Sequence, residues 1–410
     1  MKVLWFEPIG QPSRYNKDVN FGGSWEDSLE RIIRSVPSVE LFIAFVSDTY
    51  DEVKVIDGVT YIPILLKLSK YVKKSCKYWQ KYSDIFLPKA LNIVKQYQPD
   101  VIQVFGTEWP IGQIAKYTET PVVAHIQGAM IPYCNAKYPP GVSVYDEVLN
   151  TRFNPKRLLG LYIRTKNDKV RKELERDTWH AVSYYMGRTK WDYALANVLH
   201  PDCHYYHVEE AIRSEFLDYV PKEKQILHKL RLVTIGYHLL KGPDMMLKTA
   251  HILKNMGVDF EWIVVGPADL NIINFIESKV GLKYSDCKIR FVGRQNASNL
   301  KAILEDATIY VHCAYIENSP NSICEAQIMG LPVVSTDVGG ISTLVRDEID
   351  GILVPANDPW QMAFAISELN KDRVNAISMG RMGRETVLLR HNDERIKKQL
   401  ILAYRNMIDM

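Results

Sequence analysis

The sequence predicts an α/β protein with two doubly wound domains, each built on a parallel sheet. Short apolar runs alternate with helical patterns along most of the chain, which is typical of strand–helix–strand units. Ten such runs are many for one sheet, and the pattern starts again near residue 230. The length of 410 residues is also that of two or three domains.

The expected strands divide equally between the two halves of the chain. They are residues 2–6, 39–46, 101–105, 121–126 and 180–183, followed by 230–235, 261–265, 288–292, 308–312 and 333–336. Helical patterns separate most neighbouring strands, for example at 242–255, 298–306 and 321–329. We expect a first domain at 1–207, a charged linker at 208–228 and a second domain at 229–385.

The composition argues against several classes of protein. The 51 basic and 48 acidic residues give a net charge of +3, which is too balanced for general nucleic-acid binding. No apolar run approaches the roughly 20 residues of a membrane-spanning helix, and the first residues lack the pattern of a signal peptide. The scattered cysteines are typical of reduced thiols, so we expect a cytoplasmic location; they are Cys76, Cys134, Cys203, Cys287, Cys313 and Cys324.

Two glutamates stand eight positions apart just after the expected strand 308–312. Glu317 should lie on the loop at the carboxyl end of that strand, and Glu325 in the first turns of the next helix. Ligands of open parallel sheets bind at this edge, where carboxylates can accept hydrogen bonds from sugar hydroxyls and a helix start can bind phosphate. Solvent-facing glutamates are the alternative. However, Glu325 has apolar neighbours, and a carboxylate in such company needs a partner.

Glycines follow several other expected strands and favour a ligand site at the same edge. Glycine lets backbone amides approach a phosphate or sugar closely, although each pair alone is more often a plain turn. These turns are Gly22-Gly23 after the first strand, Gly293-Arg294 and Gly339-Gly340.

Lys241 precedes Gly242 and Pro243 in the first strand-to-helix turn of the second domain. Proline is favoured in the first turn of a helix, so we expect a helix to start there. A lysine at this position can neutralise a diphosphate as a point charge. The alternative is a solvated lysine at a helix start.

Four residues have the spacing of metal ligands, namely His200, Cys203, His204 and His207. The segment around the last two also alternates like a strand, which would put His204 and His207 on opposite faces. We therefore expect no metal site.

Five lysines recur at steps of three or four residues, as on one stripe of a helix with aromatic neighbours; they are Lys67, Lys70, Lys74, Lys77 and Lys81. Such a helix can lie on the anionic inner face of a membrane as a peripheral contact. A solvated helix face is the alternative. A second basic cluster, between residues 156 and 172, also fits a membrane contact.

The second half of the chain carries the motifs of a known enzyme family. After the glutamate pair come Gly330-Leu331-Pro332 and Gly339-Gly340. With these motifs the chain strongly resembles the retaining GT-B glycosyltransferases of family 4 over nearly its whole length, most closely at 232–355. The resemblance implies two Rossmann-like domains facing a cleft, with residues 386–410 returning towards the N-terminal domain. It also implies a nucleotide-sugar donor on the C-terminal domain, an acceptor on the N-terminal domain, and no metal or other cofactor.

The resemblance also implies roles for single residues. It places Glu325 at the ribose hydroxyls, with Glu317 near the donor sugar and Lys241 at the diphosphate as the catalytic pair. The donor site would further include Asn318, Ser319, Asn321, Ser322, Ile323, Gly293, Arg294, Gly22, Gly23, Gly339 and Gly340, with Arg294 near the base. The acceptor side would include His125 and Gln127.

Two positions depart from the pattern of the family. Tyr237 follows Gly236 where the family commonly has an arginine, and the loop is one residue shorter. Gln127 stands where the family often has a histidine, and His125 lies two residues earlier. These departures would alter the donor geometry or lower the activity.

We expect a retaining glycosyltransferase that moves a sugar from a UDP- or GDP-linked donor to a hydroxyl of a sugar or lipid-linked sugar acceptor. Polysaccharide or glycoconjugate biosynthesis is the expected context. In the mechanism proposed for the family, the leaving diphosphate takes the acceptor proton, while Lys241 and the helix start at Asn321 stabilise its charge. The alternatives are a GT-B epimerase or phosphorylase, and a non-catalytic GT-B protein that binds a nucleotide sugar, which the missing arginine favours.

Overall fold

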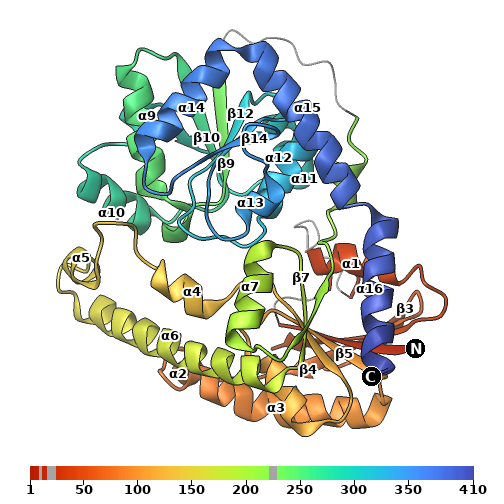
Figure 1. The fold of residues 1–410 in the computed structure, drawn as a ribbon. Coiled ribbons are helices and arrows are strands. Elements are labelled where there is room, and N and C mark those ends of the chain that lie inside the picture. Colours follow the sequence, from red (N-terminus) through yellow and green to blue (C-terminus); the bar gives the residue numbers. More distant parts are fainter. Residues whose placement is uncertain (9–11, 16–24, 221–228) are drawn as a thin grey trace. The chain divides into compact units, whose positions relative to one another are not determined.

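The computed structural model describes residues 1–8, 12–15, 25–220 and 229–410 (Figure 1). The chain divides into two compact units. Unit 1 comprises Met1–Cys134, Val144–Ala211 and Asn392–Met410, and unit 2 comprises Asn135–Ser143 and Ile212–His391. Each unit has its own sheet with helices around it, so the α/β class predicted from the sequence is confirmed.

Unit 1 is built on an eight-stranded sheet with the order β3-β4-β2-β1-β5-β6-β7-β8. Its neighbouring strands are parallel except for β3 and β4, which form an antiparallel pair. The strands are β1 Lys2–Glu7, β2 Glu40–Ser47, β3 Lys54–Ile56, β4 Val59–Leu65, β5 Val101–Phe105, β6 Val122–His125, β7 Tyr184–Gly187 and β8 His204–His207. The helices are α1 Trp25–Ile33, α2 Lys70–Lys73, α3 Tyr78–Tyr97, the 3-10 helix η1 Pro110–Tyr117, α4 Met130–Asn135, α5 Val144–Asn150, α6 Pro155–Ala181, α7 Lys190–Leu199 and α16 Asp393–Ile408.

Both faces of this sheet are buried, because consecutive strand residues enter two different cores. In β1, Leu4 and Phe6 pack on one face, whereas Val3 and Trp5 pack on the other. Side chains of α3, η1 and α6 complete the first core, and side chains of α1 and α16 complete the second. Strands buried on both faces lack polar alternation, which explains why they form continuous apolar runs in the sequence.

Unit 2 has a fully parallel six-stranded sheet with the order β11-β10-β9-β12-β13-β14. The strands are β9 Leu230–Ile235, β10 Phe260–Val265, β11 Ile289–Phe291, β12 Ile309–His312, β13 Val333–Thr336 and β14 Gly351–Val354. The helices are α8 Ser214–Leu217, η2 Leu239–Lys241, α9 Pro243–Asn255, α10 Leu270–Val280, η3 Ser285–Cys287, α11 Ala297–Glu305, α12 Asn321–Ile328, α13 Ile341–Leu344, α14 Pro359–Lys371 and α15 Arg373–Arg390.

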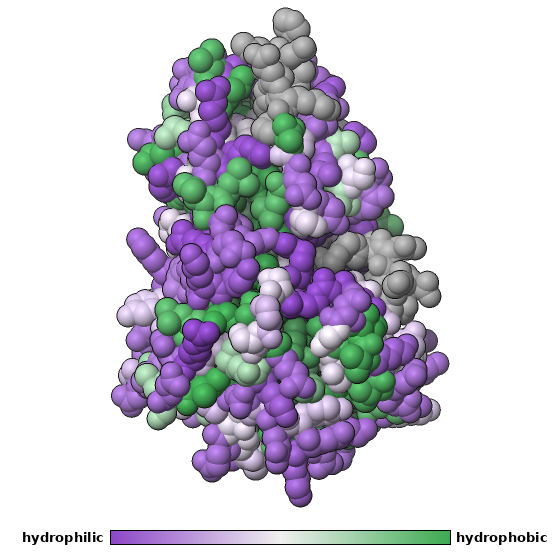
Figure 2. Space-filling view, turned by 90° about the vertical axis from the view of Figure 1, so that its right-hand side faces the viewer, coloured by the Kyte–Doolittle hydropathy of each residue, from purple (hydrophilic) through white to green (hydrophobic). Residues whose placement is uncertain are grey.

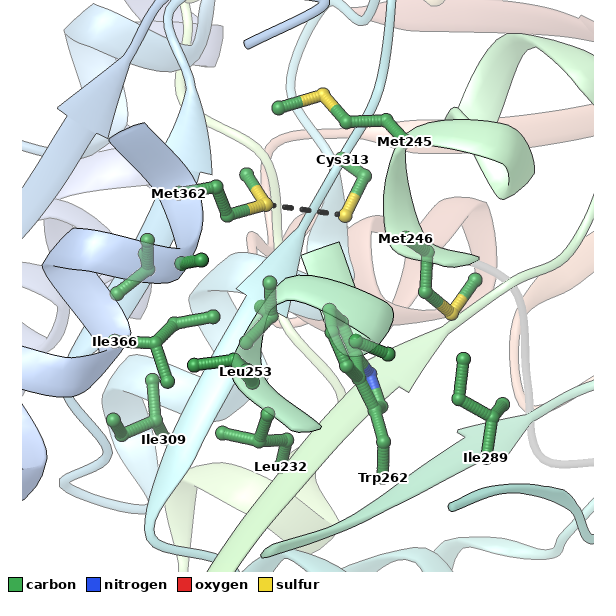
Figure 3. Close-up of a cluster of buried hydrophobic side chains, with 14 of the residues drawn as sticks. Leu232, Met245, Met246, Leu253, Trp262, Ile289, Ile309, Cys313, Met362 and Ile366 are labelled. Carbon is green, nitrogen blue, oxygen red and sulfur yellow. Dashed lines mark hydrogen bonds between the residues drawn. The ribbon is translucent and has the colours of Figure 1, made fainter. Parts of the chain in front are cut away.

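The sheet of unit 2 is also covered on both faces, and Figure 3 shows part of one core. Trp262 lies there among aliphatic side chains, and the Cys313 thiol is 3.4 Å from the sulfur of Met362. The indole N–H of Trp262 donates to the Thr234 hydroxyl at 2.9 Å, which in turn donates to the Val311 carbonyl at 2.7 Å. The buried indole N–H of Trp262 and the buried hydroxyl of Thr234 are therefore satisfied within the sheet.

One predicted strand is wrong, and five observed strands are absent from the ten that were predicted. Residues 180–183 end helix α6 and precede β7, because the amide of Val182 still bonds to the Thr178 carbonyl and caps that helix. The strands β3, β4, β7, β8 and β14 are additional, although the alternation of residues 204–207 had suggested β8. Each of the other predicted strands agrees with an observed strand to within one residue at either end.

The units also divide the chain differently from the expected domains. Residues 135–143 lie in unit 2, because Val142 packs against its core, although they fall within the expected first domain 1–207. The last helix begins at Asp393, after Asn392 caps it, and belongs to unit 1. Its Tyr404 hydroxyl accepts from the Trp5 indole at 2.9 Å, which ties the helix to β1.

Among the described residues, no helix combines the length and the apolar character needed to cross a bilayer. On the face drawn in Figure 2, hydrophilic residues cover most of the surface and hydrophobic residues form separate patches. Scattered apolar residues of this kind are normal on folded domains.

Glu175 of α6 is a buried carboxylate that caps another helix. Its oxygens accept from the amides of Met130 and Ile131 at 2.8 Å each and from the Thr107 hydroxyl at 3.0 Å. These amides open α4, where the first N–H groups of a helix need outside partners. Burial raises the pKa of Glu175 from 4.5 to about 7, and the three hydrogen bonds oppose that rise.

We predict that Glu175 makes stability fall as the pH rises from about 4.5 to about 7. A carboxyl whose pKa is higher in the folded state binds its proton more tightly there, and this stabilises the folded state. The stabilisation is fully present below pH 4.5 and is lost as the pH rises to about 7. Across that window, the unfolding free energy of the wild type minus that of Glu175→Gln should decline by up to about 3 kcal/mol. Urea denaturation at several pH values measures it. Glu173→Gln, exposed on the same helix, is the control, and a difference that stays constant with pH would contradict the prediction.

Candidate functional site

The candidate site of unit 2 lies at the carboxyl ends of its central strands. Glu317 is on the loop that follows β12, and Glu325 is in the second turn of α12, as the sequence predicted. Lys241 ends the short helix η2 after β9, the strand beside β12. Because the strands are parallel, these loops all leave the same edge of the sheet.

Lys241 and Glu317 form an ion pair between the lysine ammonium and a carboxylate oxygen. Both side chains are largely buried, with 15% and 18% of their surface exposed. The two residues predicted as the catalytic pair are thus in direct contact. The positive charge of Lys241 is thus compensated by Glu317. An anionic ligand would have to replace Glu317 as the partner of the lysine.

His312, the last residue of β12, lies beneath this pair and was missed by the sequence analysis. Its Nε2 atom is 3.8 Å from a Glu317 oxygen and has no hydrogen-bond partner among the described residues. Its Nδ1 atom is 3.4 Å from the Tyr310 hydroxyl. Burial, together with the charge of Lys241, holds the pKa of His312 well below its usual value, so the ring is neutral. The sequence did carry a signal for His312, because a histidine stands at the end of an apolar strand five residues before Glu317.

Glu325 is paired with Arg213, which the sequence analysis also missed. The Arg213 Nε atom donates to Oε1 of Glu325 at 3.0 Å, and an Nη2–H donates to the same oxygen. Burial raises the pKa of Glu325, and Arg213 opposes that rise. The partner expected for a carboxylate in apolar company is therefore an arginine 112 residues earlier in the chain.

The start of α12 brings the small polar residues of the predicted donor site together. Asn318, Ser319 and Ser322 are buried, and Pro320 stands at the N-cap. The Ser322 side chain hydrogen-bonds the Tyr310 hydroxyl. The Asn321 Oδ1 atom is buried with no hydrogen-bond partner among the described residues.

Ile323 differs from the other predicted phosphate-binding positions. Its amide donates to the Pro320 carbonyl at 3.0 Å, and its side chain is fully buried. The amide therefore serves to start the helix. Asn321 and Ser322 precede it, at the positions where helix amides face outward.

Gly339 and Gly340 support the loop that carries Glu317. The Gly340 amide donates to the Glu317 carbonyl at 3.0 Å. A Cβ atom on Gly339 would lie 1.8 Å from that carbonyl oxygen, and its φ of +56° is in the left-handed region. Both glycines contact the backbone carbonyl of Glu317. The turn therefore fixes the backbone position of Glu317 and leaves its side chain to the site.

Gly293 and Arg294 lie farther along the sheet edge. They follow β11, which β10 and β9 separate from β12. The Gly293 carbonyl accepts from the Gly266 amide at 2.9 Å, and Arg294 is exposed on the loop before α11.

Tyr237, which replaces the arginine of the family pattern, is a core residue. Its ring packs edge-on against Tyr284 and Phe291, and its hydroxyl donates to the Tyr284 hydroxyl at 2.9 Å. Only 5% of its surface is exposed. The side chain at position 237 therefore supplies no charge to the candidate site.

The predicted acceptor-side residues lie in unit 1, at the end of β6. His125 is fully buried, with Nδ1 3.3 Å from the Gln103 amide and the ring edge-on to Trp25 at 4.9 Å. Burial holds the pKa of His125 well below its usual value. The Gln127 amide donates to Glu26 at 2.6 Å. Gly22 and Gly23 lie outside the described residues.

Of the four residues with metal-like spacing, three have a structural partner or lie on a strand, and Cys203 packs against the core of unit 1. The His200 ring bonds to the Val182 carbonyl at 2.9 Å, and His204 and His207 are the two ends of β8. In the part of the chain that the structure describes, no three His, Cys, Asp or Glu side chains are grouped as metal ligands.

The five lysines predicted as one helical stripe do not share a helix. The short helix α2 ends at Lys73, and α3 begins at Tyr78. The Ser75 hydroxyl accepts from the Lys77 amide at 3.2 Å and stabilises the turn between them. All five lysines are nevertheless exposed, and Asn167 of α6 donates to the Ser75 carbonyl at 3.2 Å, which places this basic segment beside α6.

Helices α5 and α6 expose apolar and basic side chains together, which the sequence analysis noted only for the charges. A salt bridge between Glu147 and Arg164 joins the two helices. We call this the α5–α6 surface and include in it the residues that connect the two helices; its exposed apolar residues are Val144, Tyr145, Leu149, Phe153, Leu159 and Tyr162. Residues 155–167 at the start of α6 contain four basic residues and no acidic one.

Comparison with known protein families places the site in context. Residues 229–372 match the family model described as glycosyl transferases group 1. A D-inositol 3-phosphate glycosyltransferase of Salinispora tropica is 33% identical over 141 residues, which are 32% of this chain and 29% of the relative. An amylovoran biosynthesis glycosyltransferase of Erwinia amylovora is 26% identical over 199 residues, 46% of each chain. The chain thus spans less than half the length of these curated relatives.

Solved structures match over the whole chain. Sucrose-phosphate synthase from Thermosynechococcus elongatus has a TM-score of 0.74 at 17% identity and covers 100% of this chain and 99% of its own. The Anabaena protein Alr3699/HepE, solved in complex with UDP and glucose, has a TM-score of 0.63 at 13% identity and covers 99% of both chains. At these identities the likeness shows the fold, which is the GT-B type with two Rossmann-like domains.

We predict that Gly339→Ala destabilises unit 2 and displaces Glu317. The new methyl group would overlap the Glu317 carbonyl, and the left-handed φ adds strain. Urea denaturation should show a loss of roughly 3 kcal/mol or more. Gly281→Ala is the matched control, because its φ of +75° is similar but its Cβ would meet nothing within 4 Å. That variant should lose only about 1 kcal/mol, and equal losses in the two variants would contradict the prediction.

Proposed function

We propose that this chain, whose residues 229–372 match the family model of the group 1 glycosyltransferases, transfers a sugar from a nucleotide-diphosphate-sugar to an acceptor hydroxyl. The observation that carries the proposal is the convergence of Lys241, Glu317 and Glu325 at one edge of the unit 2 sheet. The diphosphate of such a donor is negatively charged and needs a cation, whereas its neutral hydroxyls need acceptors such as carboxylates.

Each residue at this edge has a role in the proposed donor complex. Glu325 accepts hydrogen bonds from the ribose hydroxyls, and Glu317 contacts the donor sugar. Lys241 neutralises the diphosphate, and the first amides of α12, at Asn321 and Ser322, donate to its oxygens. The contact between Lys241 and Glu317 supports this assignment, since it holds a cation and a sugar-binding carboxylate side by side.

The proposed reaction retains the anomeric configuration and needs no nucleophile from the protein. The bond between the anomeric carbon and the diphosphate oxygen breaks, and the acceptor oxygen bonds to the same face of the sugar. The acceptor proton passes to the leaving diphosphate. Negative charge that develops on the diphosphate is stabilised by Lys241 and by the start of α12, so no metal is required in this scheme.

The donor and the context are proposed from the relatives. The Anabaena neighbour is solved with UDP and glucose, and this supports a UDP-linked sugar, with a GDP-linked sugar as the alternative. The Erwinia relative is named for the biosynthesis of amylovoran, and this supports a role in polysaccharide or glycoconjugate assembly.

We also propose a peripheral membrane contact for unit 1, which suits a lipid-linked acceptor. The exposed lysines from Lys67 to Lys81 lie beside α6, and the α5–α6 surface adds exposed aromatic rings and further basic residues. Aromatic and apolar side chains next to lysine and arginine are the pattern of interfacial helices on anionic lipids. The exposed apolar side chains of the α5–α6 surface favour a membrane contact over a helix face that is simply exposed to solvent.

A non-catalytic protein that binds a nucleotide sugar is the second candidate. The observation that favours it is the burial of Tyr237, which leaves the donor site without the cation of the family pattern. The two candidates differ in turnover: a catalyst hydrolyses or transfers the sugar of a bound donor, whereas a binder releases it unchanged.

We predict that one nucleotide sugar raises the melting temperature and that Glu325→Ala abolishes the shift. A ligand at 100 times its Kd stabilises the folded state by about 2.7 kcal/mol through mass action. UDP-, GDP-, ADP- and TDP-sugars form the panel. Glu261→Ala, which removes a carboxylate at the other edge of the same sheet, should keep the shift. Folded protein that responds to no donor would contradict the proposed function.

We predict that Lys241→Ala lowers the rate of donor hydrolysis by about 10²- to 10³-fold, because it removes charge stabilisation from the leaving diphosphate. The measurement is release of free sugar from the donor that stabilises the wild type. Donor binding without measurable hydrolysis or transfer by the wild type would favour the non-catalytic candidate.

We predict that the whole protein sediments with anionic vesicles through its unit 1, and that the triple change of Lys67, Lys70 and Lys74 to Gln weakens the binding ten- to hundredfold. Each lysine near an anionic surface contributes about 1 kcal/mol. Phe153→Ser with Tyr162→Ser should also weaken binding by removing apolar contact. The control changes three exposed lysines of unit 2 to Gln, namely Lys254, Lys279 and Lys288. Unchanged binding of both test variants would rule out this contact.

A further inference from the structure

The pair between Arg213 and Glu325 has a geometry that bears on ligand recognition. Two N–H groups of Arg213 donate to a single oxygen, Oε1 of Glu325. Each carboxylate oxygen has two lone pairs, so these two bonds occupy Oε1. The second oxygen, Oε2, then carries the acceptor capacity that remains for a ligand.

The surroundings of Glu325 make its ionisation depend on this arginine. Its side chain is 7% exposed, and its helix neighbours Ile323, Cys324 and Ala326 are fully buried. A protonated carboxyl in that place would present an O–H donor, whereas a pair of ribose hydroxyls is best bound by an acceptor. Burial raises the pKa of Glu325 and Arg213 opposes that rise, so the arginine favours the form that can accept two hydrogen bonds.

The other polar groups around Glu325 do not replace Arg213. Glu215, on α8, raises the pKa of Glu325 further by charge repulsion. Tyr310 of β12 carries a neutral hydroxyl whose pKa lies far above the neutral range. Arg390 of α15 is committed to the Gln327 amide oxygen and to two backbone carbonyls.

We propose that Arg213 is a positioning residue for nucleotide recognition, which holds Glu325 as an oriented carboxylate whose Oε2 accepts the ribose hydroxyls. This inference rests on the proposed function, because it assumes a nucleotide at Glu325. Arg213 acts through Glu325. The guanidinium of Arg213 lies over the ring of Phe216, at 5.0 Å from the centroid. This contact helps to fix the orientation of its N–H groups in the absence of a ligand.

The test measures the affinity for UDP and for GDP by calorimetry between pH 6 and pH 9. Arg213→Met keeps an apolar stem over Phe216 and removes the charge. Its affinity should fall on the order of tenfold at pH 7, because the pKa of Glu325 rises further when the arginine is removed, and should recover towards pH 9 as the carboxyl ionises. Arg213→Lys restores the positive charge and should follow the pH profile of the wild type. Glu325→Gln should bind weakly at every pH.

Arg231→Met is the matched control, since Arg231 forms an ion pair with Glu261 at 2.9 Å at the opposite edge of the same sheet. It should bind like the wild type. An Arg213→Met variant that binds like the wild type at every pH would overturn the proposal, and so would a loss of affinity that does not recover at high pH. A wild type that binds neither nucleotide would instead count against the proposed function, together with the inference built on it.

Discussion

A parallel sheet buried on both faces is the constraint on which the rest of this structure depends. In unit 2, Leu232 and Val233 are neighbours in one strand and yet enter opposite cores. The middle positions of its central strands are buried, so charged side chains lie at strand ends, on the edge strand β11 and in the loops beyond the strands. At the carboxyl ends of the strands, Lys241 and Glu317 therefore lie on neighbouring connections, and Glu325 lies in the first turns of α12. Chemistry at that edge thus follows from how the core is built.

Groups gathered in this way must be paired even without a ligand, because a buried charge without a partner is costly. Lys241 is held by Glu317, and Glu325 is held by Arg213. The site is therefore not a set of free charges that wait for a substrate. Any ligand that binds here has to exchange with, or share, contacts that the protein already makes, and its affinity reports the difference between the two sets of contacts.

Much of the fold could be predicted from the sequence because both sheets are made of short apolar runs separated by helices. The glutamate pair and Lys241 could also be placed, since a strand pattern fixes which edge a following loop occupies. Arg213 could not, because its partner is 112 residues away and only the tertiary structure joins them. The sequence showed that Tyr237 follows the first strand of unit 2. That its ring lies in the core is seen only from its packing against Tyr284 and Phe291. The spacing of the lysines from 67 to 81 suggested one helix, and a local turn at Ser75 overrides it.

The helix α16 completes the core of unit 1 although it follows the whole of unit 2 in the chain. Ile396, Leu400 and Tyr404 pack with Val3 and Trp5, which are almost 400 residues earlier. During synthesis, residues 212–391 of unit 2 leave the ribosome before α16 does. Unit 2 can therefore pack its core first, while the second core of unit 1 stays open on one side. The second core of unit 1 is therefore completed by a segment that is made after unit 2.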